Sequence, residues 1–385
     1  MHRLLVGVLD ACGLRDDVFT LGLRGKVDPE LNPGFVERIL SARAILRERM
    51  DDLKLSGLIE LFDPDTYANQ ATVGENLLFG TPVGETFQPQ NLMSNAYLHD
   101  ILVKSGLEGM LVEKGIELAE TTIGLFQDLP PDHELFNQLT FMDGERLPRY
   151  QALMRKVKQS GIPSLSDEER SMLVELMFEY IEPQHRMGLV DDELKEKVLT
   201  ARAAFKNELP DELKEAISFY DPDNYNSAAS VMDNLLMGRV TYGMARGPER
   251  VSDAVQTLLQ ELGLVDDVLG IGLEFDVGSG GKRLSSAQRQ KVGLGRAIIK
   301  QPDLLVLNRV IGALDARQQA AVVNDVMRLV NAQEDPPTVV WVLTNASLAS
   351  HFDTVCVVAE GKVVEFGNRE QLAQKKGAYA KLLEG

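Results

Sequence analysis

Two short apolar runs in the last third of the chain, separated by a stretch of helical periodicity, form the clearest hydrophobic pattern in the sequence. The runs Leu304–Leu307 and Thr338–Leu343 are bounded by polar residues, which is typical of strands buried on both faces of a parallel sheet. Helical periodicity precedes the first run over Ala287–Ile299 and separates the two runs over Ala316–Val330. The order helix, strand, helix, strand predicts an α/β layer with a right-handed crossover.

The rest of the chain adds a hairpin at the end and a mainly helical region before the α/β layer. Thr354–Val358 and Lys362–Phe366, joined at Glu360-Gly361, are expected to form a hairpin that finishes the sheet. In the middle region, a capping box at Ser166–Glu169 predicts a helix over Asp167–Ile181, and Asp191–Lys206 is amphipathic and charged. Prolines divide this region into pieces, at Pro130-Pro131, Pro163 and Pro183.

An internal repeat runs through the helical region. Phe62–Gly80 matches Tyr220–Gly238 at a constant offset of 158, from Asp221 minus Asp63, and Leu40–Ala44 echoes Leu199–Ala203. A helix ending in Gly-Leu follows each copy, at residues 106–107 and 263–264, and residues 13–14 repeat this ending. The unit is too long for a solenoid, so we interpret it as a partial duplication. The simplest local reading of each DPD-x-Y segment is a turn whose aspartates cap the next helix while the tyrosine packs on it.

The stretch Leu284–Asp315 resembles the second half of an ATP-binding cassette (ABC) domain of the exporter type. The family pattern is LSGGQRQR, an Arg-Ala pair, a hydrophobic strand ending in Asp-Glu, and SALD. This chain matches it without a gap at Leu284, Ser285, Gln288, Arg289, Gln290, Arg296, Ala297, Pro302, Ala313, Leu314 and Asp315. The resemblance continues through the switch region at 344–347 and the segment Gly361–Gly367, and the V-x-[ED]-N-[LI]-L-x-G elements of the repeat resemble the opening of the ABC helical subdomain.

This resemblance implies a fold class and a division into domains. The expected fold is α/β and P-loop NTPase-like, the C-terminal part of an ABC cassette without its Walker A half, preceded by a mainly α-helical region. Residues 1–219 would form the helical region with the partial duplication, and residues 220–385 would form the nucleotide-binding-like domain.

The residues at the working positions differ from those of the family. Asn308 and Arg309 stand where the family has the Mg²⁺-linked Asp and the catalytic Glu, and a guanidinium stays protonated and cannot act as a general base. Ser286-Ala287 replace two glycines that let backbone N–H groups approach a γ-phosphate, and Asn345 replaces the switch histidine. The resemblance therefore implies no confident catalytic residue.

Two further elements of a nucleotide site are missing from the sequence. A phosphate-cradling loop needs the pattern GxxxxGK[ST], and the three Gly-Lys pairs, at residues 25, 281 and 361, lack both its upstream glycine and its following Ser or Thr. The glutamine that the family places before the helical subdomain is absent around Asp221–Asp223. A complete site would need a phosphate loop from another polypeptide or from an upstream segment.

Composition narrows the functional classes. With 385 residues and 44% hydrophobic residues, the chain can bury a substantial core, and no apolar run approaches the roughly 18 residues of a membrane span or forms a secretory leader. A net charge of −18 argues against a nucleic-acid surface. Cys12 and Cys356 are too far apart for a metal motif, as are His99, His133, His185 and His351, and the apolar side chains of Met172–Phe178 are expected in a core.

Two hypotheses of different class follow. The first is an ATP-binding subunit or fragment of an ABC transporter that couples ATP binding, with impaired hydrolysis, to export through a membrane-domain partner. The second is a non-catalytic, ABC-derived regulatory or scaffold protein that pairs with an active cassette. Under the first hypothesis, ATP and Mg²⁺ would be shared with a second nucleotide-binding domain, and this arrangement would be compatible with a dimer. The chain would lie in the cytoplasm, peripheral to the inner face of the membrane.

The candidate nucleotide-binding residues are those that the resemblance places in a shared site. They are Ser285, Ser286, Ala287, Gln288, Asp315 and Asn345, with Asn308 near Mg²⁺ and Arg309 at the general-base position. The alternative is that these residues keep their positions only as scaffolding of the fold. Both readings stay open on the sequence.

Overall fold

The chain divides into two compact units, and each is described by itself. The computed structural model describes residues 2–126 and 145–384; Pro130-Pro131 and His133 therefore lie outside the described residues. The first unit comprises Met1–Leu23 and Val268–Gly385, and the second comprises Arg24–Asp267. The boundary predicted between residues 219 and 220 lies inside the second unit.

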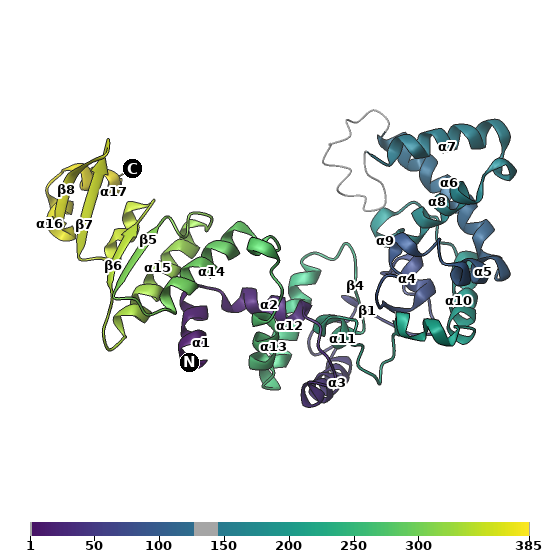
Figure 1. Ribbon diagram of the computed structural model, residues 1–385, viewed down its shortest axis with the longest axis horizontal. Helices are drawn as coiled ribbons and strands as arrows, with labels where there is room; N and C mark the ends of the chain where they lie inside the picture. Colours follow the sequence, from purple (N-terminus) through teal and green to yellow (C-terminus); the bar gives the residue numbers. More distant parts are fainter. Residues whose placement is uncertain (1, 127–144, 385) are drawn as a thin grey trace. The chain divides into compact units, whose positions relative to one another are not determined.

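The first unit contains the predicted α/β layer, with helices α1, α14 and α15 beside strands β5 and β6 (Figure 1). The predicted helix–strand–helix–strand order is confirmed. The elements of this unit, including two helices that reach its boundaries, are α1 His2–Ala11, α2 Arg15–Arg24, α13 Val265–Leu273, α14 Ser286–Ile298, β5 Leu304–Asn308, α15 Ala316–Asn331, β6 Thr338–Val342, β7 Thr354–Ala359, β8 Lys362–Asn368, α16 Arg369–Gln374 and α17 Ala378–Glu384.

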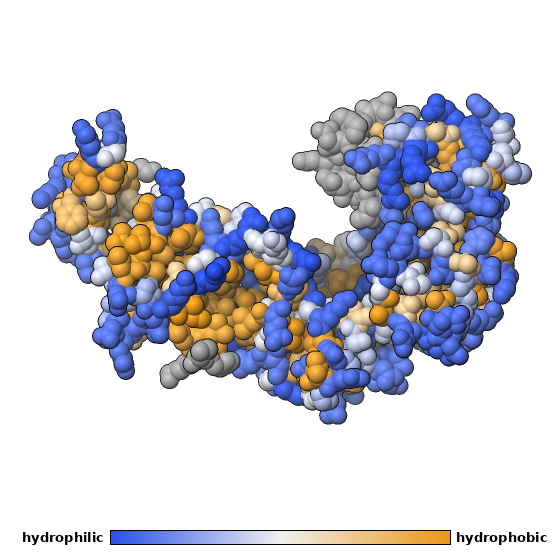
Figure 2. Space-filling view, viewed as in Figure 1, coloured by the Kyte–Doolittle hydropathy of each residue, from blue (hydrophilic) through white to orange (hydrophobic). Residues whose placement is uncertain are grey.

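Strands β5 and β6 are parallel and pair in register from Leu304 with Thr338 to Asn308 with Val342. The expectation that both faces of these strands are buried is wrong for the described residues. Leu305 and Leu307 are buried, but the alternate side chains of Leu304 and Val306 are 56% and 61% exposed. Side chains alternate between the faces of a strand, so helices cover one face and leave an apolar face open. Figure 2 shows hydrophobic side chains gathered over these two strands.

Strands β7 and β8 form the predicted hairpin, with the turn at Glu360-Gly361. Both turn residues have positive φ, 50° and 74°, which a tight two-residue turn requires. The hairpin does not finish the β5–β6 sheet as predicted. It is a separate two-stranded sheet, and it packs with α16 and α17 around the buried side chains of Val357, Leu372 and Tyr379.

The close crossing of α2 and α13 depends on two glycines. A Cβ added at Gly22 would lie 2.0 Å from the carbonyl oxygen of Val268, and one added at Gly272 would lie 2.0 Å from that of Val18. Only a residue without a side chain permits backbones to approach this closely. The shared sequence Asp-Asp-Val-x3-Gly of the two helices therefore has a packing role.

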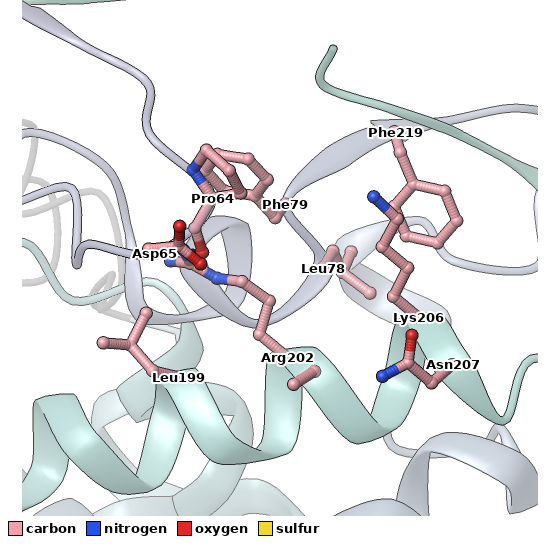
Figure 3. Close-up of a pocket in the computed structure, with 10 residues that line it drawn as sticks. Pro64, Asp65, Leu78, Phe79, Leu199, Arg202, Lys206, Asn207 and Phe219 are labelled. Atoms are coloured by element: carbon pink, nitrogen blue, oxygen red, sulfur yellow. Dashed lines mark hydrogen bonds between the residues drawn. The ribbon is translucent and has the colours of Figure 1, made fainter.

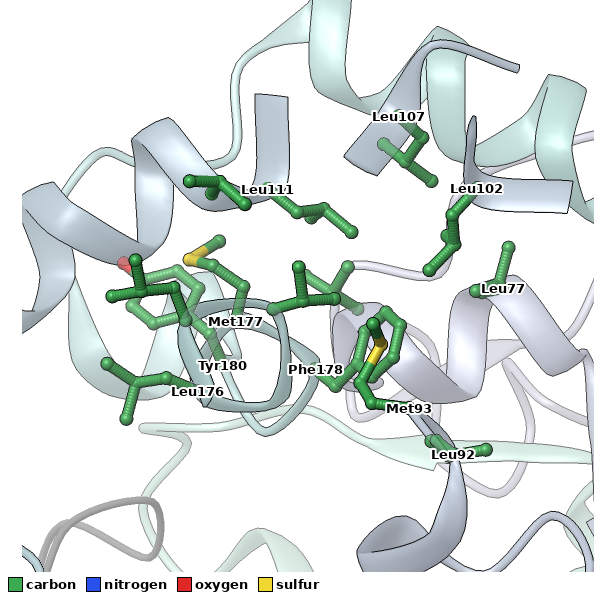
Figure 4. Packing of buried hydrophobic residues seen from close by; sticks show 14 of the residues in the cluster. Leu77, Leu92, Met93, Leu102, Leu107, Leu111, Leu176, Met177, Phe178 and Tyr180 are labelled. Atoms are coloured by element: carbon green, nitrogen blue, oxygen red, sulfur yellow. The ribbon is translucent and has the colours of Figure 1, made fainter. Parts of the chain in front are cut away.

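The second unit is mainly helical. Its elements are α3 Pro33–Glu48, β1 Ile59–Leu61, α4 Val73–Leu78, β2 Gly80–Pro82, α5 Ala96–Lys104, α6 Leu107–Phe126, α7 Leu147–Ser160, α8 Asp167–Phe178, α9 Glu182–His185, α10 Asp192–Asn207, β3 Ile217–Phe219, α11 Val231–Leu236, β4 Gly238–Val240 and α12 Gly247–Glu261. The capping box at Ser166–Glu169 and the amphipathic helix beginning after Asp191 are confirmed. Figure 4 shows buried hydrophobic side chains of its core, among them Leu77, Leu111, Met177 and Phe178. The prediction that Met172–Phe178 packs as core is confirmed for its buried members.

Short strands join the two copies of the repeat to each other. β1 pairs antiparallel with β4, and β2 pairs antiparallel with β3, so each ladder takes one strand from an end of each copy. Leu61 pairs with Gly238, and Phe219 pairs with Gly80. Adding the offset of 158 converts Leu61 into Phe219 and Gly80 into Gly238, so the two pairs are equivalent with the copies interchanged. The two copies are therefore related by a local pseudo-twofold arrangement.

Candidate functional site

The signature-like segment forms the start of α14. The Ser285 hydroxyl accepts a hydrogen bond from the Gln288 N–H at 3.1 Å, and the Gln288 carboxamide oxygen accepts from the Ser285 N–H at 2.9 Å. This reciprocal capping box satisfies two helix-terminal donors. Ser285 and Gln288 thus fix the N-terminus of the helix, and the Ser286 hydroxyl accepts from the Arg289 guanidinium at 3.2 Å.

The side chains of α14 also anchor the N-terminal helices. The Gln288 amide donates to Asp17 at 3.0 Å, and the Lys291 ammonium donates to the other oxygen of Asp17 at 2.8 Å and to the Gly13 carbonyl at 2.9 Å. Lys291 and Asp17 are both largely covered, so this ion pair is less screened than an exposed one. The family-like Gln288 therefore has a packing role that the sequence did not indicate.

The carboxyl ends of β5 and β6 lie at one edge of the sheet. Asn308 is the last residue of β5, and its register partner Val342 is three residues before Asn345. Arg309 follows with a φ of 50°, a left-handed conformation that side-chain-bearing residues seldom adopt. The structure therefore brings the Asn308 and Asn345 backbones toward one edge, as the parallel order requires.

Asp315 and Asn345 are both helix caps. The Asp315 carboxylate accepts from the Gln318 N–H at 2.8 Å at the start of α15. The Asn345 carboxamide oxygen accepts from the N–H and the hydroxyl of Ser347 at 2.9 and 2.8 Å. One contact ties this region to α14, because the Gln290 carboxamide oxygen accepts from the Ala313 N–H at 2.8 Å.

The site holds few groups suited to Mg²⁺–ATP on its own. Among the described residues, no cluster of three or more His, Cys, Asp or Glu side chains is placed to hold a metal ion. Asn308 offers one neutral oxygen donor, and the cationic Arg309 beside it would repel a divalent cation. The residues present do not fit Mg²⁺–ATP by themselves, and Asn308 as a Mg²⁺ ligand stays a prediction.

A different cluster in the second unit was not predicted, and it centres on Arg202 of α10. Its guanidinium donates to the carbonyl oxygens of Asn76, Pro64 and Thr66 at 2.6, 2.9 and 2.9 Å, and to the Asn76 side-chain oxygen at 2.8 Å. The side chain is 5% exposed, and burial lowers the pKa of Arg202 to about 10. We call this arrangement an arginine latch. Figure 3 shows Arg202 reaching from α10 toward Pro64 and Asp65 at a pocket of about 270 Å³.

Arg43 of α3 makes the same latch on the second copy of the repeat. It donates to the carbonyl oxygens of Asn234, Pro222 and Asn224 at 2.6, 2.6 and 3.0 Å, and to the Asn234 side-chain oxygen at 3.2 Å. Every acceptor is the residue 158 positions after its counterpart. Each latch helix binds the copy of the repeat that does not directly follow it in the chain. Helix α3 precedes the first copy and binds the second, whereas α10 precedes the second copy and binds the first.

The DPD-x-Y segments held by these latches are turns, as predicted. The Asp63 and Asp221 carboxylates accept from the N–H groups of Asp65 and Asp223, and Tyr67 is buried. The prediction that these aspartates cap the following helices is wrong. Thr72 caps α4 and Ser230 caps α11, because a cap must lie directly before its helix.

One further arginine joins the two copies. The Arg239 guanidinium of β4 contacts Glu75 at 2.8 Å and Asp233 at 3.0 Å, two carboxylates at equivalent positions of the repeat. Burial acts to lower the pKa of Arg239, but these two carboxylates outweigh it and raise the pKa. The repeated Ala-Arg-Ala sequence could have indicated the latches, whereas nothing in the sequence marks Arg239.

Comparison with known proteins finds similarity to ABC transporters. The chain is 30% identical over 171 residues, 44% of its length, to the ABC-type transporter fsqE of Aspergillus fumigatus, of which it covers 12%. It is 27% identical over 225 residues, 58% of its length, to the ATP-dependent lipid A-core flippase of Xylella fastidiosa, of which it covers 35%. It is 22% identical over 365 residues, 93% of its length, to the uncharacterized ABC transporter ATP-binding protein y4gM of Sinorhizobium fredii, of which it covers 58%.

Two of these relatives are ABC transporters by name, and the chain is similar to all three at low identity over 44% to 93% of its length. The chain spans between 12% and 58% of the length of these three curated relatives. No family model and no solved structure matches it. Within the part of the chain that the structure describes, no helix combines the length and the apolar character needed to cross a bilayer.

Proposed function

We propose that the chain is a cassette-derived component of an ABC transporter that presents its signature and switch residues to a nucleotide held mainly by a partner cassette. The observation that carries the proposal is the parallel register of β5 and β6, which brings Asn308 and the segment leading to Asn345 to one edge of the sheet. The α14 side chain of Gln290 supports it by holding the loop before Asp315 through Ala313. The names of two relatives, one described as ATP-binding and one as ATP-dependent, are consistent with this role.

Hydrolysis by the chain's own residues is not part of the proposal. A general base must accept a proton from water, and the guanidinium of Arg309 has no acceptor capacity at neutral pH. Asn345 can hydrogen-bond but cannot carry the proton of a switch histidine. The chain would transmit ATP binding to a membrane-domain partner from the cytoplasmic face, together with a second nucleotide-binding domain.

The test uses the full chain and Mg²⁺–ATP. Isothermal titration calorimetry is expected to show no saturable binding by the chain alone, because the sequence contains no phosphate-cradling loop. The double variant Asn308→Asp, Arg309→Glu is expected to remain without ATPase activity for the same reason. Turnover by that variant would reveal a complete nucleotide site in this chain and contradict the proposal.

A second candidate, a non-catalytic scaffold that pairs with an active cassette, is favoured by the capping roles. The side-chain oxygens of Ser285, Asp315 and Asn345 each accept a hydrogen bond from a backbone N–H at a helix start, which a purely structural role would also require. The two candidates differ at Ser286, which is exposed and outside the Ser285–Gln288 capping box. Ser286→Arg should lower the ATPase rate of an assembled transporter if α14 faces nucleotide, and should leave it unchanged if the chain is a scaffold.

A further inference from the structure

Helix α14 is a third copy of the helix that carries the arginine latch. Aligned on the Arg-Ala pair, α3, α10 and α14 place Arg43, Arg202 and Arg296 at one position. Their N-cap residues Asn32, Asp191 and Ser285 also align, each 11 residues before its arginine by subtraction of positions. The three helices therefore share the spacing from the N-cap residue to the arginine.

A contact that does not involve these arginines supports the equivalence. Five residues before Arg43, Arg38 donates to the Gly263 carbonyl at 2.7 Å and to Asp267 at 2.8 Å. Five residues before Arg296, Lys291 donates to the Gly13 carbonyl and to Asp17 in the same way. Both cations grip a Gly-Leu-x-Asp-Asp turn, so α14 packs on its neighbouring helix end as α3 does.

The arginine face of α14, in contrast, is open. In α3 and α10 the positions equivalent to Val292, Arg296 and Ile299 are all buried; they are Ile39, Arg43 and Leu46 in α3, and Val198, Arg202 and Phe205 in α10. In α14, Arg296 is exposed and Ile299 is 36% exposed. No hydrogen bond or ion pair within the described residues engages the Arg296 guanidinium, whereas each latch arginine has at least four good acceptors.

The open face lines an apolar groove of about 270 Å³ between α14 and the N-terminal helices. Its walls are apolar side chains of α1, α2, α13 and α14 and of the loop between α13 and α14, and its polar members are Asp17, Gln288 and Arg296. Figure 2 shows hydrophobic side chains around α1 and α14. In the two closed copies, the corresponding face is covered by the short helices α4 and α11, which carry Asn76 and Asn234.

We propose that the groove on α14 binds a third DPD-x-Y and V-x-[ED]-N-L-L element, supplied by a partner polypeptide. The sequence contains two such elements, at Phe62–Gly80 and Tyr220–Gly238, and both are held by α10 and α3. The recognition chemistry is that of the latches: turn carbonyls and an asparagine side-chain oxygen accept from Arg296, while paired leucines enter the apolar groove. The proposal goes beyond nucleotide presentation, and it centres on Arg296, which is not among the candidate nucleotide-binding residues.

The probe is a fluorescein-labelled peptide with the sequence Tyr220–Gly238, closed by a lactam bridge that stabilises its helix, titrated into the full chain. Fluorescence anisotropy should show saturable binding. Arg296→Met in the chain and Asn234→Leu in the peptide should each weaken it at least tenfold, the equivalent of about 1.4 kcal/mol, one hydrogen bond to a charged group. Lys300→Met, which changes a neighbouring exposed cation outside the groove lining, is the matched control and should change affinity less than twofold.

Three outcomes would overturn the proposal. They are the absence of saturable binding up to millimolar peptide, binding that Arg296→Met leaves unchanged, and a chain that dimerises through this face. Sedimentation velocity of the wild type and Arg296→Met tests the last, because Arg296-dependent dimerisation would assign the groove to a second copy. None of these outcomes depends on ATP, so a failure here is distinct from a failure of the proposed function.

Discussion

Replacing Arg202 by methionine tests the arginine latch as the main link between α10 and the first repeat copy. The change removes four hydrogen bonds of 2.6 to 2.9 Å from a side chain that is 5% exposed. Each hydrogen bond to a charged group is worth about 1.5–3 kcal/mol, but the four share one guanidinium and do not add. Methionine fills part of the volume, and the adjoining pocket lets water reach the freed turn carbonyls. We therefore expect a loss of about 3–5 kcal/mol in the free energy of unfolding.

Hydrogen exchange measured by mass spectrometry resolves where that loss falls. In Arg202→Met, amides of residues 62–80 should lose protection, while the sister segment 220–238, held by Arg43, serves as the internal control and keeps most of its protection. Arg296→Met is the matched control variant, because this equivalent arginine is exposed, and should cost less than about 0.5 kcal/mol. A loss below 1 kcal/mol for Arg202→Met, or equal loss of protection in both copies, would refute the latch.

Three further predictions follow from packing and from pKa. Gly272→Ala should destabilise by more than about 3 kcal/mol, because its Cβ would lie 2.0 Å from a facing backbone oxygen, whereas Gly270→Ala in the same helix meets no atom within 4 Å and should be neutral or stabilising. Leu305→Ala should cost about 2–4 kcal/mol in denaturation followed by tryptophan fluorescence, and Val306→Ala on the open face less than about 0.5 kcal/mol. Burial lowers the pKa of His185 from 6.5 to about 4. As the pH drops from about 6.5 to about 4, the imidazole is protonated in the unfolded chain but not in the folded chain, so the free energy of unfolding should fall over this range.

Each of these predictions has a result that contradicts it. Equal stability of the two glycine variants would show that the helices do not cross closely. A large cost for Val306→Ala would mean that the apolar face of β5 and β6 is covered in solution. The pH dependence should be smaller in His185→Gln, and an unchanged slope between pH 4 and 6.5 would assign it to other groups.

Local patterns predicted the elements of this protein well. The capping box at Ser166, the helix over 286–298 and the hairpin turn at Glu360 depend on neighbouring residues, and their sequence signals were sufficient. The exposure of Val306 could not be predicted in the same way. An apolar run indicates that a strand is favoured in a buried position, but it does not show which of its faces are covered by other elements.

The sequence predicted which positions could belong to the candidate site, but not which groups their side chains contact. The family-like residues Ser285, Asp315 and Asn345 are at helix starts, and whether they also meet a nucleotide stays a prediction. The latches escaped sequence reasoning because Arg43 binds a segment about 180 residues away, past the nearer copy of the same element. Repetition made two partners equally suitable in sequence, and only the fold shows which one is used.

Under the proposed function, this chain holds no complete nucleotide site and offers its signature helix to a nucleotide bound elsewhere. Calorimetric titration of the full chain with Mg²⁺–ATP tests it most directly. No saturable heat of binding is expected up to millimolar nucleotide. Stoichiometric binding with a Kd in the micromolar range would contradict it, because the residues at Ser285, Asn308 and Asn345 would then form a site that needs no partner.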